Sequence, residues 1–355
     1  MSFRFHLLGL PNAPVSTDYS LDGFAVAGHR FARMMRSLGH HIILYGAEGS
    51  DLEVCDEFVP IISETERKTL LGPCEYQHAF MDERYPLWQR SNATAAAEVF
   101  RRKKPGDFLL TIGGLSQKPI FDFNQDMLGV EYSIGYEGSF CPYRVFESYA
   151  WMHTSYGKQN ITIGRFFDTV IPLFFDPDHF TVNENPEDYF LFVGRLIELK
   201  GLNIACQAAS AAGVKLKIIG HGGSTKNITG GHQYLGAVDW KTRNELMSKA
   251  RGLFAPTIYC EPFNAAAIEA QMCGTPVIST DFGGFTETVE GGKTGFRCHY
   301  LGEFVRAIKA VDNLSRRSIA TRARIKYSMW NIRNDYDSYF RRLKLLWKDG
   351  WNSLD

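Results

Sequence analysis

The chain has 355 residues, of which 45% are hydrophobic and 22% charged, and its 39 basic side chains balance 39 acidic ones. This length favours two domains of ordinary size, and a net charge of zero gives no general reason to bind nucleic acid. No apolar run approaches the roughly 20 residues that span a bilayer. Seven cysteines without a C-x-x-C pair, and a start that resembles a strand more than a signal peptide, indicate reduced thiols and a cytoplasmic protein.

The first half shows strands and helices in alternation. Strands are expected at residues 3–10, 41–45, 108–112, 128–133 and 169–172. Apolar side chains at helical spacing predict helices at 24–38 and at 91–104, the second capped by Ser91 or Asn92. Strand, helix and strand in this order form a right-handed βαβ unit, so a doubly wound parallel sheet is predicted.

Several polar side chains follow strands of this half, at the edge where parallel sheets bind ligands. The candidate substrate contacts are Asp18, Tyr136, Glu137, Arg144 and His153. The last four lie in a stretch dense in aromatic residues, much of which must form core. We expect the histidine among them to be a core residue rather than a base.

Two stretches of the first half carry unusual charge. Residues 55–88 mix charged and aromatic side chains without a clear period, and we interpret them as a loop for a partner or substrate. The basic run Arg101–Lys104 is explained by the preference for cations at a helix C-terminus. One alternative is contact with an anionic membrane surface, which would make the protein peripheral at a membrane. The other is contact with a substrate phosphate.

Residues 171–180 resemble an interdomain connection. Asp176 and Asp178 form a D-x-D triplet of the kind that can hold a divalent metal, but the proline between them favours a turn, so no metal is expected. We therefore predict a first domain at 1–172, a second at 173–328, and a C-terminal helix at 329–355 that packs back on the first domain.

The second half repeats the alternation. Strands are expected at residues 189–193, 216–219, 234–235, 253–255 and 276–279. Helices are expected at 202–212, at 240–250 with Asp239 as cap, at 301–313, and along the amphipathic tail 316–347.

The segment Cys260–Glu287 carries the strongest signal for a site. Asn264 can cap a helix whose first turn is three alanines, and Gly274 can end it. Uncovered amides and the helix dipole form an anion site. Glu261 and Glu269 flank this site and can accept hydrogen bonds from hydroxyl groups, an arrangement that suits a nucleotide sugar.

Three further loops should meet this helix at the carboxyl edge of the second sheet. They contain Arg195 with Lys200, the glycines Gly220–Gly223, and the segment Asp281–Glu287. The two cations can neutralise a diphosphate and stabilise it as a leaving group. The glycines allow close approach of the backbone.

With these motifs, the second half resembles the donor domain of retaining glycosyltransferases of the GT-B fold, family four. The resemblance covers about residues 171–300 and is carried by FVGRLIELKG (Phe192–Gly201), IIGHGG (Ile218–Gly223), YLGAVDW (Tyr234–Trp240), the E-P-F pair Glu261 and Glu269, CGTPVIST (Cys273–Thr280), GGFTE (Gly283–Glu287) and GKTGF (Gly292–Phe296).

The resemblance implies an α/β protein with two Rossmann-like, doubly wound parallel-sheet domains facing a central cleft, the first binding the acceptor and the second the donor. It implies catalytic roles for Glu261, Arg195 and Lys200, with the two cations on the pyrophosphate. Glu269 would bind the ribose, and the backbone near Val238 the base. Further donor contacts are expected from Gly194, Gly222, Phe263, Asn264, Ala265, Gly283, Gly284 and Glu287.

The function implied is transfer of a hexose from a UDP- or GDP-sugar to a hydroxyl acceptor with retention of configuration, without metal or cofactor. The sequence leaves the base, the sugar, the acceptor (glycan, lipid or small molecule) and the oligomeric state open. Asn264 stands where the family usually has glycine, which can alter sugar contacts. The alternatives are a nucleotide-sugar epimerase of the same architecture and a non-catalytic nucleotide-sugar binding protein.

Overall fold

The computed structural model describes residues 2–17, 23–72 and 82–346. The chain forms two compact units. Unit 1 comprises Met1–Glu147, Ile161–Phe174 and Met329–Asp355, and unit 2 comprises Ser148–Asn160 and Phe175–Ser328. These units differ from the expected domains in one main respect, because residues 148–160 belong to unit 2 rather than to the first domain.

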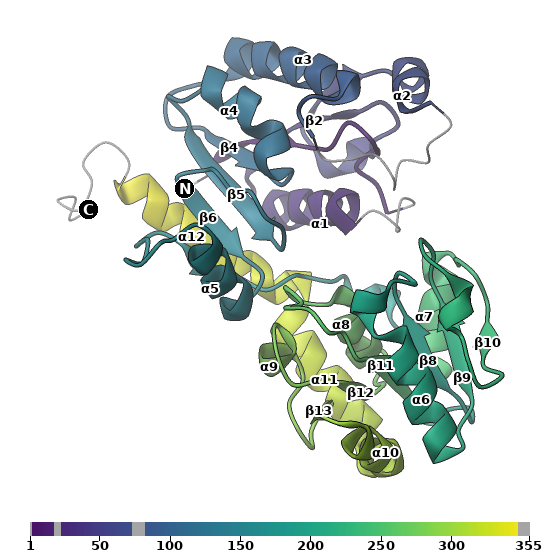
Figure 1. Ribbon diagram of the computed structural model, residues 1–355. Helices are drawn as coiled ribbons and strands as arrows, with labels where there is room; N and C mark the ends of the chain where they lie inside the picture. Colours follow the sequence, from purple (N-terminus) through teal and green to yellow (C-terminus); the bar gives the residue numbers. More distant parts are fainter. Residues whose placement is uncertain (1, 18–22, 73–81, 347–355) are drawn as a thin grey trace. The chain divides into compact units, whose positions relative to one another are not determined.

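Unit 1 is built on a seven-stranded parallel sheet of order β3-β2-β1-β4-β5-β6-β7 (Figure 1). Its strands are β1 (Arg4–Leu8), β2 (His41–Ala47), β3 (Glu57–Ile62), β4 (Phe108–Thr111), β5 (Leu128–Ile134), β6 (Tyr143–Phe146) and β7 (Thr169–Val170). The predicted doubly wound parallel sheet is confirmed. Strands β3 and β6 were not predicted, because they lie in the charged and aromatic stretches that lack a clear period.

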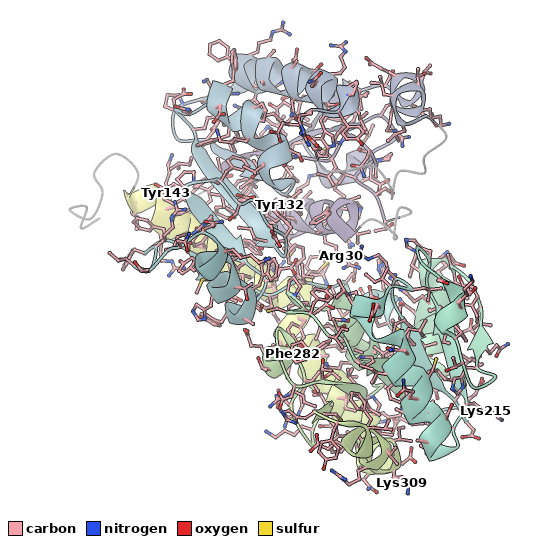
Figure 2. All side chains as sticks on the ribbon, in the orientation of Figure 1. Arg30, Tyr132, Tyr143, Lys215, Phe282 and Lys309 are labelled. Atoms are coloured by element: carbon pink, nitrogen blue, oxygen red, sulfur yellow. The ribbon has the colours of Figure 1, made fainter. Side chains whose placement is uncertain are left out.

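Helices cover both faces of this sheet (Figure 1). Helices α1 (Gly23–Ser37) and α12 (Met329–Leu346) pack on one face, and α3 (Pro86–Arg102) and α4 (Lys118–Phe123) on the other. Side chains alternate between the two cores along each strand, as β geometry requires. Phe5 and Leu7 of β1 therefore join the first core, which includes Tyr132 (Figure 2), and Leu8 joins the second.

Two predictions for this unit need correction. Helix α3 begins at Pro86, in the first helical position where proline is favoured. Ser91 and Asn92 are therefore buried inside the helix instead of capping it, and the Asn92 amide donates to the Ser116 carbonyl at 2.7 Å. The stretch interpreted as a loop contains β3 and α2 (Glu64–Leu71).

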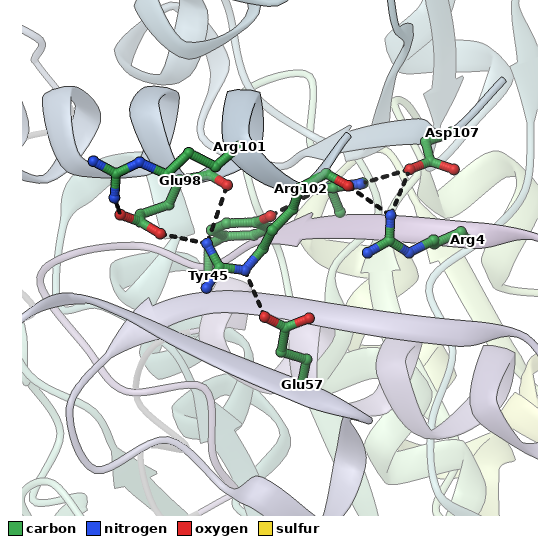
Figure 3. Close-up of polar contacts among 8 residues, drawn as sticks. Arg4, Tyr45, Glu57, Glu98, Arg101, Arg102 and Asp107 are labelled. Carbon is green, nitrogen blue, oxygen red and sulfur yellow. Dashed lines mark hydrogen bonds and ion pairs between the residues drawn. The ribbon is translucent and has the colours of Figure 1, made fainter. Parts of the chain in front are cut away.

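Three of the four cations in the basic run Arg101–Lys104 pair with acidic side chains. Figure 3 shows Arg102 between Glu57 and Glu98, while Arg101 also pairs with Glu98. Lys103 pairs with Asp126 at 2.5 Å. Arg101, Arg102 and Lys103 thus have partners within unit 1. The same figure shows Arg4, whose guanidinium donates to the Arg102 carbonyl at 2.6 Å and so ties β1 to the end of α3.

Unit 2 is built on a six-stranded parallel sheet of order β10-β9-β8-β11-β12-β13. Its strands are β8 (Phe190–Val193), β9 (Leu216–Ile219), β10 (Gln233–Tyr234), β11 (Gly252–Ala255), β12 (Val277–Thr280) and β13 (Gly295–Cys298).

Helices α6 (Leu202–Ala212) and α10 (Leu301–Ala310) pack on one face. The other helices of the unit are α5 (Tyr149–Lys158), α7 (Trp240–Lys249), α8 (Ala265–Met272), α9 (Phe285–Thr288) and α11 (Arg316–Tyr327), and α8 packs against both α7 and α11. Lys215 and Lys309 lie exposed on the outside of the unit (Figure 2).

The C-terminal tail is two helices rather than one. Helix α11 ends at Ser328, which has extended backbone, and belongs to unit 2. Helix α12 belongs to unit 1, where its Asp337 accepts from His40 at 3.0 Å and its Tyr339 hydroxyl donates to the Phe167 carbonyl at 2.8 Å. Helix α12 therefore covers an apolar face of unit 1, whereas α11 packs within unit 2.

The D-x-D triplet forms the expected turn. The Asp176 side chain accepts from the Asp178 amide at 3.1 Å and caps the short 3-10 helix Pro177–His179. Over the described residues, no helix combines the length and the apolar character needed to cross a bilayer.

Arg316, the first residue of α11, holds several parts of unit 2 together. Its buried guanidinium donates to the Ala250 and Ser248 carbonyls, at the end of α7, at 2.9 and 2.7 Å. It also reaches the Thr275 hydroxyl at 2.6 Å. Within the described residues it has no carboxylate partner, and burial lowers the pKa of this arginine to about 10. A charged guanidinium here satisfies carbonyls that a helix end leaves free.

We expect Arg316→Met to lower the free energy of unfolding of unit 2 by about 3 kcal/mol, because several buried acceptors lose their donor at once. Chemical denaturation of the full chain measures this change. The matched control is Arg317→Met, since the side chain of Arg317 is 79% exposed and pairs with Glu184 at the surface. Equal effects of the two substitutions would contradict this account of Arg316.

Candidate functional site in unit 2

Four loops of unit 2 leave the same edge of its sheet. They follow β9, β8, β11 and β12, which are neighbours in the sheet and all parallel. Arg195 follows β8, Gly220 follows β9, Glu261 follows β11, and Asp281 follows β12. The expected convergence of these loops is therefore present in the topology.

Lys200 and Glu261 form an ion pair at the centre of this edge. The Lys200 ammonium lies 2.6 Å from Glu261 Oε2, and the two side chains are only 16% and 7% exposed. The ammonium also donates to the Tyr259 hydroxyl at 2.9 Å. Two residues predicted to be catalytic are thus in direct contact, and a tyrosine that the sequence analysis did not identify joins them.

Three further side chains donate to the Glu261 carboxylate. The Tyr259 hydroxyl reaches Oε1 at 2.9 Å, while the Thr257 hydroxyl and the Asn264 amide reach Oε2 at 3.1 and 3.3 Å. Burial, together with the charge of Glu261, raises the pKa of Tyr259 well above its usual value, so its phenol stays protonated and donates. The carboxylate is held in one orientation.

Asn264 caps helix α8 as predicted. Its side-chain oxygen accepts from the Ala267 amide at 3.0 Å. Its backbone has φ of 69°, a region that favours glycine and, after it, asparagine. This explains how asparagine can replace the usual glycine here. Within the described residues, the Ala265 and Ala266 amides make no hydrogen bond, so the uncovered part of the first turn is limited to these two donors.

The glycines of the next loop support the backbone of Glu261. Gly283 has φ of 62°, and a Cβ there would lie 2.8 Å from the Glu261 nitrogen. The Gly284 amide donates to the Glu261 carbonyl at 2.7 Å. Gly283 and Gly284 therefore allow the loop after β12 to lie close to the loop that carries Glu261. The sequence analysis expected these glycines to contact a ligand instead.

Glu269 is paired with a cation that the sequence analysis missed. Arg243 of α7 lies 3.0 Å from Glu269 Oε1, and the two side chains are 18% and 8% exposed. The other carboxylate oxygen has no hydrogen bond within the described residues, so it can accept one from a ligand hydroxyl. No local sequence signal identifies Arg243, because the pairing depends on how α7 and α8 pack.

Arg195 differs from Lys200 in having an exposed side chain. It makes no hydrogen bond or ion pair within the described part of the chain. Its charge acts on the Tyr259 phenol, which indicates that the two lie near each other. Lys200 and Arg243 are each paired with a glutamate, so among these three cations Arg195 is the one that has no acidic partner within the described residues.

Helix α5 braces the E-P-F loop. The Ser148 hydroxyl donates to the Pro262 carbonyl at 2.5 Å, and Thr154 lies 3.3 Å from the Cys260 sulfur. Glu287 accepts from the Tyr149 and Ala150 amides at the start of α5 at 3.0 and 2.8 Å. The predicted donor contact Glu287 therefore has both carboxylate oxygens engaged in holding this helix.

The remaining donor-side candidates have different positions. Phe263 is buried and packs edge-on against Tyr327, with ring centroids 5.6 Å apart, so its side chain is part of the core. Gly194 and Gly222 lie in the loops after β8 and β9, and a Cβ on Gly222 would meet open space. Val238 is half-buried in the loop before α7.

The candidates of the first half do not form one cluster. Asp18 lies outside the described residues. Arg144 has a wholly buried side chain that pairs with Asp168, so it stabilises the interior of unit 1 instead of facing a substrate. His153 lies on α5 of unit 2 and is exposed beside Tyr149 and Tyr156, so the expectation of a core histidine was wrong. Glu137 is exposed.

Tyr136 contacts a buried carboxylate in unit 1. Its hydroxyl donates to Glu131 Oε1 at 3.0 Å, and the Phe140 and Cys141 amides donate to Oε2 at 2.8 and 3.2 Å. Glu131 is fully buried. Burial raises the pKa of Glu131 to about 7, although these three hydrogen bonds act in the opposite direction. The tyrosine thus has a structural partner.

Comparison with known proteins shows that unit 2 is similar to glycosyltransferases. Residues 175–326 match the family model described as glycosyl transferases group 1. A probable sucrose-phosphate synthase from Thermosipho melanesiensis is 39% identical over 92 residues, which are 25% of this chain and 22% of that protein. A D-inositol 3-phosphate glycosyltransferase from Gordonia bronchialis is 41% identical over 63 residues, which are 17% of this chain and 14% of that protein. The match thus spans less than a quarter of each of these relatives.

Solved structures extend the likeness to nearly the whole chain. AviGT4, a glycosyltransferase involved in avilamycin A biosynthesis, has a TM-score of 0.72 at 20% identity and covers 96% of this chain and 98% of its own. Sucrose-phosphate synthase from Thermosynechococcus elongatus has a TM-score of 0.70 at 16% identity, covering 96% and 99%. Anabaena HepE, solved with UDP and glucose, has a TM-score of 0.66 at 15% identity, covering 96% and 100%. The fold is GT-B, as the sequence resemblance predicted.

Glu131 gives a pH-dependent prediction. Its pKa is raised from 4.5 to about 7 in the folded protein, so the folded state binds more protons than the unfolded state between these values. Stability should therefore fall as the pH rises through this range, by about 3 kcal/mol. Glu131→Gln should remove this loss of stability. In chemical denaturation, the free energy of unfolding of the variant relative to the wild type should therefore increase from pH 4.5 to pH 8. Glu53→Gln, at an exposed position, should show no such trend.

Proposed function

We propose that this protein is a glycosyltransferase that moves a hexose from a nucleoside diphosphate sugar, UDP- or GDP-linked, to a hydroxyl acceptor. The observation that carries the proposal is the contact between Lys200 and Glu261 beside the start of α8 and the unpaired cation Arg195. The match of residues 175–326 to glycosyl transferases group 1 and the likeness to AviGT4 support it. HepE, solved with UDP and glucose, supports a nucleotide-linked donor.

The charges of the site suit a diphosphate. Arg195 has no acidic partner within the described residues, and the Lys200 ammonium has three N–H donors, of which Glu261 and Tyr259 take two. The third N–H, the Arg195 guanidinium and the Ala265 and Ala266 amides are all available to phosphate oxygens. Together these groups would bind the pyrophosphate and stabilise the charge that develops when the sugar departs.

The two glutamates would orient the rest of the donor. Glu269 has one free carboxylate oxygen beside Arg243 and would accept from the ribose hydroxyls. Glu261 would accept from a hydroxyl of the transferred sugar. The backbone near Val238 would contact the base. Transfer would retain the anomeric configuration, with the leaving phosphate assisting removal of the acceptor proton.

The acceptor would bind to unit 1. Glu137 is the exposed candidate there, whereas Arg144 and Tyr136 have buried partners. The chemistry requires a hydroxyl group on a glycan, a lipid or a small molecule. The ion pairs of the run Arg101–Lys104 give no reason to prefer a membrane-bound acceptor.

We expect two substitutions to separate binding from transfer. Arg195→Gln should weaken binding of UDP or GDP about tenfold, because a charge-assisted contact to phosphate is lost. Glu261→Gln should not weaken that binding, because it removes the charge that compensates Lys200, and it should lower transfer about a hundredfold, because the sugar loses its orienting carboxylate. Calorimetry measures the first effect, and release of nucleoside diphosphate in the presence of a hydroxyl acceptor measures the second.

The matched control is Arg317→Gln, which changes an exposed arginine of unit 2 outside the site. It should behave like the wild type in both assays. Donor binding without transfer or donor hydrolysis would refute the enzyme assignment in favour of a binding protein. Conversion of the donor sugar without an acceptor would refute it in favour of an epimerase.

We also expect transfer to proceed without a divalent metal. Arg195, Lys200 and the start of α8 already supply the positive charge that a metal provides to a leaving diphosphate in other enzymes. Asp176, the residue with the spacing of a metal ligand, caps its own turn. Rates measured with and without EDTA should agree within about twofold. Loss of activity in EDTA that Mg²⁺ or Mn²⁺ restores would contradict this part of the proposal.

A further inference from the structure

We propose that Tyr259 is a positioning residue that reserves one lone pair of Glu261 for a single hydroxyl of the donor sugar. The inference rests on the proposed function and concerns how the same site recognises the sugar. It follows from the distribution of hydrogen bonds on the Glu261 carboxylate and from the position of the Tyr259 hydroxyl between Glu261 and Lys200.

The two carboxylate oxygens of Glu261 are used unequally. A carboxylate offers about four acceptor positions, two on each oxygen. Lys200, Thr257 and Asn264 all donate to Oε2, which is therefore saturated. Among the described residues, only Tyr259 donates to Oε1. One acceptor position remains on the whole carboxylate, and it lies on the oxygen that Tyr259 holds.

The donors come from separate parts of unit 2, so they fix the carboxylate in space. Thr257 and Tyr259 follow β11, Lys200 ends the 3-10 helix Glu198–Lys200, and Asn264 caps α8. The Thr257 backbone is itself held, because its carbonyl accepts from the Thr280 hydroxyl at 2.6 Å. A carboxyl group bonded from three directions cannot rotate to offer a different oxygen without breaking several of these bonds.

Tyr259 also links the two charges of the pair. Its hydroxyl accepts from the Lys200 ammonium and donates to Glu261 Oε1, both at 2.9 Å. The ammonium lies 5.1 Å from the centre of the tyrosine ring, within the range of a cation–π contact. The Tyr259 hydroxyl therefore fixes the position of Glu261 Oε1, which would bind the sugar, relative to the Lys200 ammonium, which would bind phosphate. A donor can contact both groups only if its sugar hydroxyl lies at the right place relative to its phosphates.

Asn264 adds a third donor to Oε2. Its amide reaches this oxygen at 3.3 Å while its side-chain oxygen caps α8. A glycine at this position would have no side chain to donate to Glu261, but Lys200 and Thr257 would still fill the two acceptor positions of Oε2. The oxygen held by Tyr259 is therefore the point of recognition with either residue.

The experiment uses Tyr259→Phe in the full chain, with UDP, GDP, UDP-glucose, GDP-mannose and their singly deoxygenated sugar analogues as probes. The substitution should lower the affinity for the preferred nucleotide sugar, and its rate of transfer or hydrolysis, about tenfold, because the orienting bond to a charged group is lost. The affinity for the bare nucleoside diphosphate should stay within about twofold. For one deoxygenated donor, wild type and variant should be equal, since the hydroxyl that Glu261 binds is then absent.

The matched control is Tyr189→Phe, which removes a hydroxyl that donates to the Leu246 carbonyl at 2.8 Å elsewhere in unit 2. It should leave every affinity unchanged. An equal loss for nucleoside diphosphate and nucleotide sugar, or an equal loss for all deoxygenated donors, would overturn the positioning role, as would a Tyr259→Phe variant that matches the wild type. If the wild type itself binds no nucleotide sugar, the proposed function fails, and this inference fails with it.

Discussion

The buried pair of Lys200 and Glu261 is the interaction on which the candidate site depends. Taking two charges out of water costs free energy that their attraction only partly returns, so a buried ion pair is weak evidence for a role in stability. Here three more side chains donate to the carboxylate, and the surrounding fold maintains the arrangement. A buried polar cluster that costs free energy and in which each charged group has several hydrogen-bond partners is better explained by a function that needs fixed charges.

The rest of unit 2 holds this pair through contacts between segments far apart in the sequence. Gly283 and Gly284 lie directly against the backbone of Glu261, and α5 reaches the same loop from residues more than a hundred positions earlier. Arg316 joins the ends of α7 and α11 on the helical layer that includes α8. The position of a few side chains at the sheet edge therefore depends on packing throughout the unit.

This dependence explains which features the sequence could predict. Helix α8 and its Asn264 cap were predicted because the cap, the alanines and the closing glycine are adjacent in the chain. The parallel sheets followed from alternating patterns of strand and helix. Tyr259 and Arg243 were not identified, since their roles appear only when β11, α7 and α8 are packed together. Arg144 and Tyr136 were taken for substrate contacts because a sequence does not reveal the buried partners Asp168 and Glu131.

Under the proposed function, the division of charge at this edge would bear on turnover as well as on binding. Two of the cations are each paired with a glutamate, so their charges are largely compensated, and only Arg195 is exposed and unpaired within the described residues. Three uncompensated cations would bind the leaving nucleoside diphosphate more tightly than one, and product release often limits the rate of an enzyme. Binding energy is useful when it is greatest in the transition state, where the diphosphate gains charge as it leaves the sugar. If the proposed function holds, a single exposed arginine beside fixed, compensated pairs would strengthen its contact with the diphosphate in the transition state and still release the product.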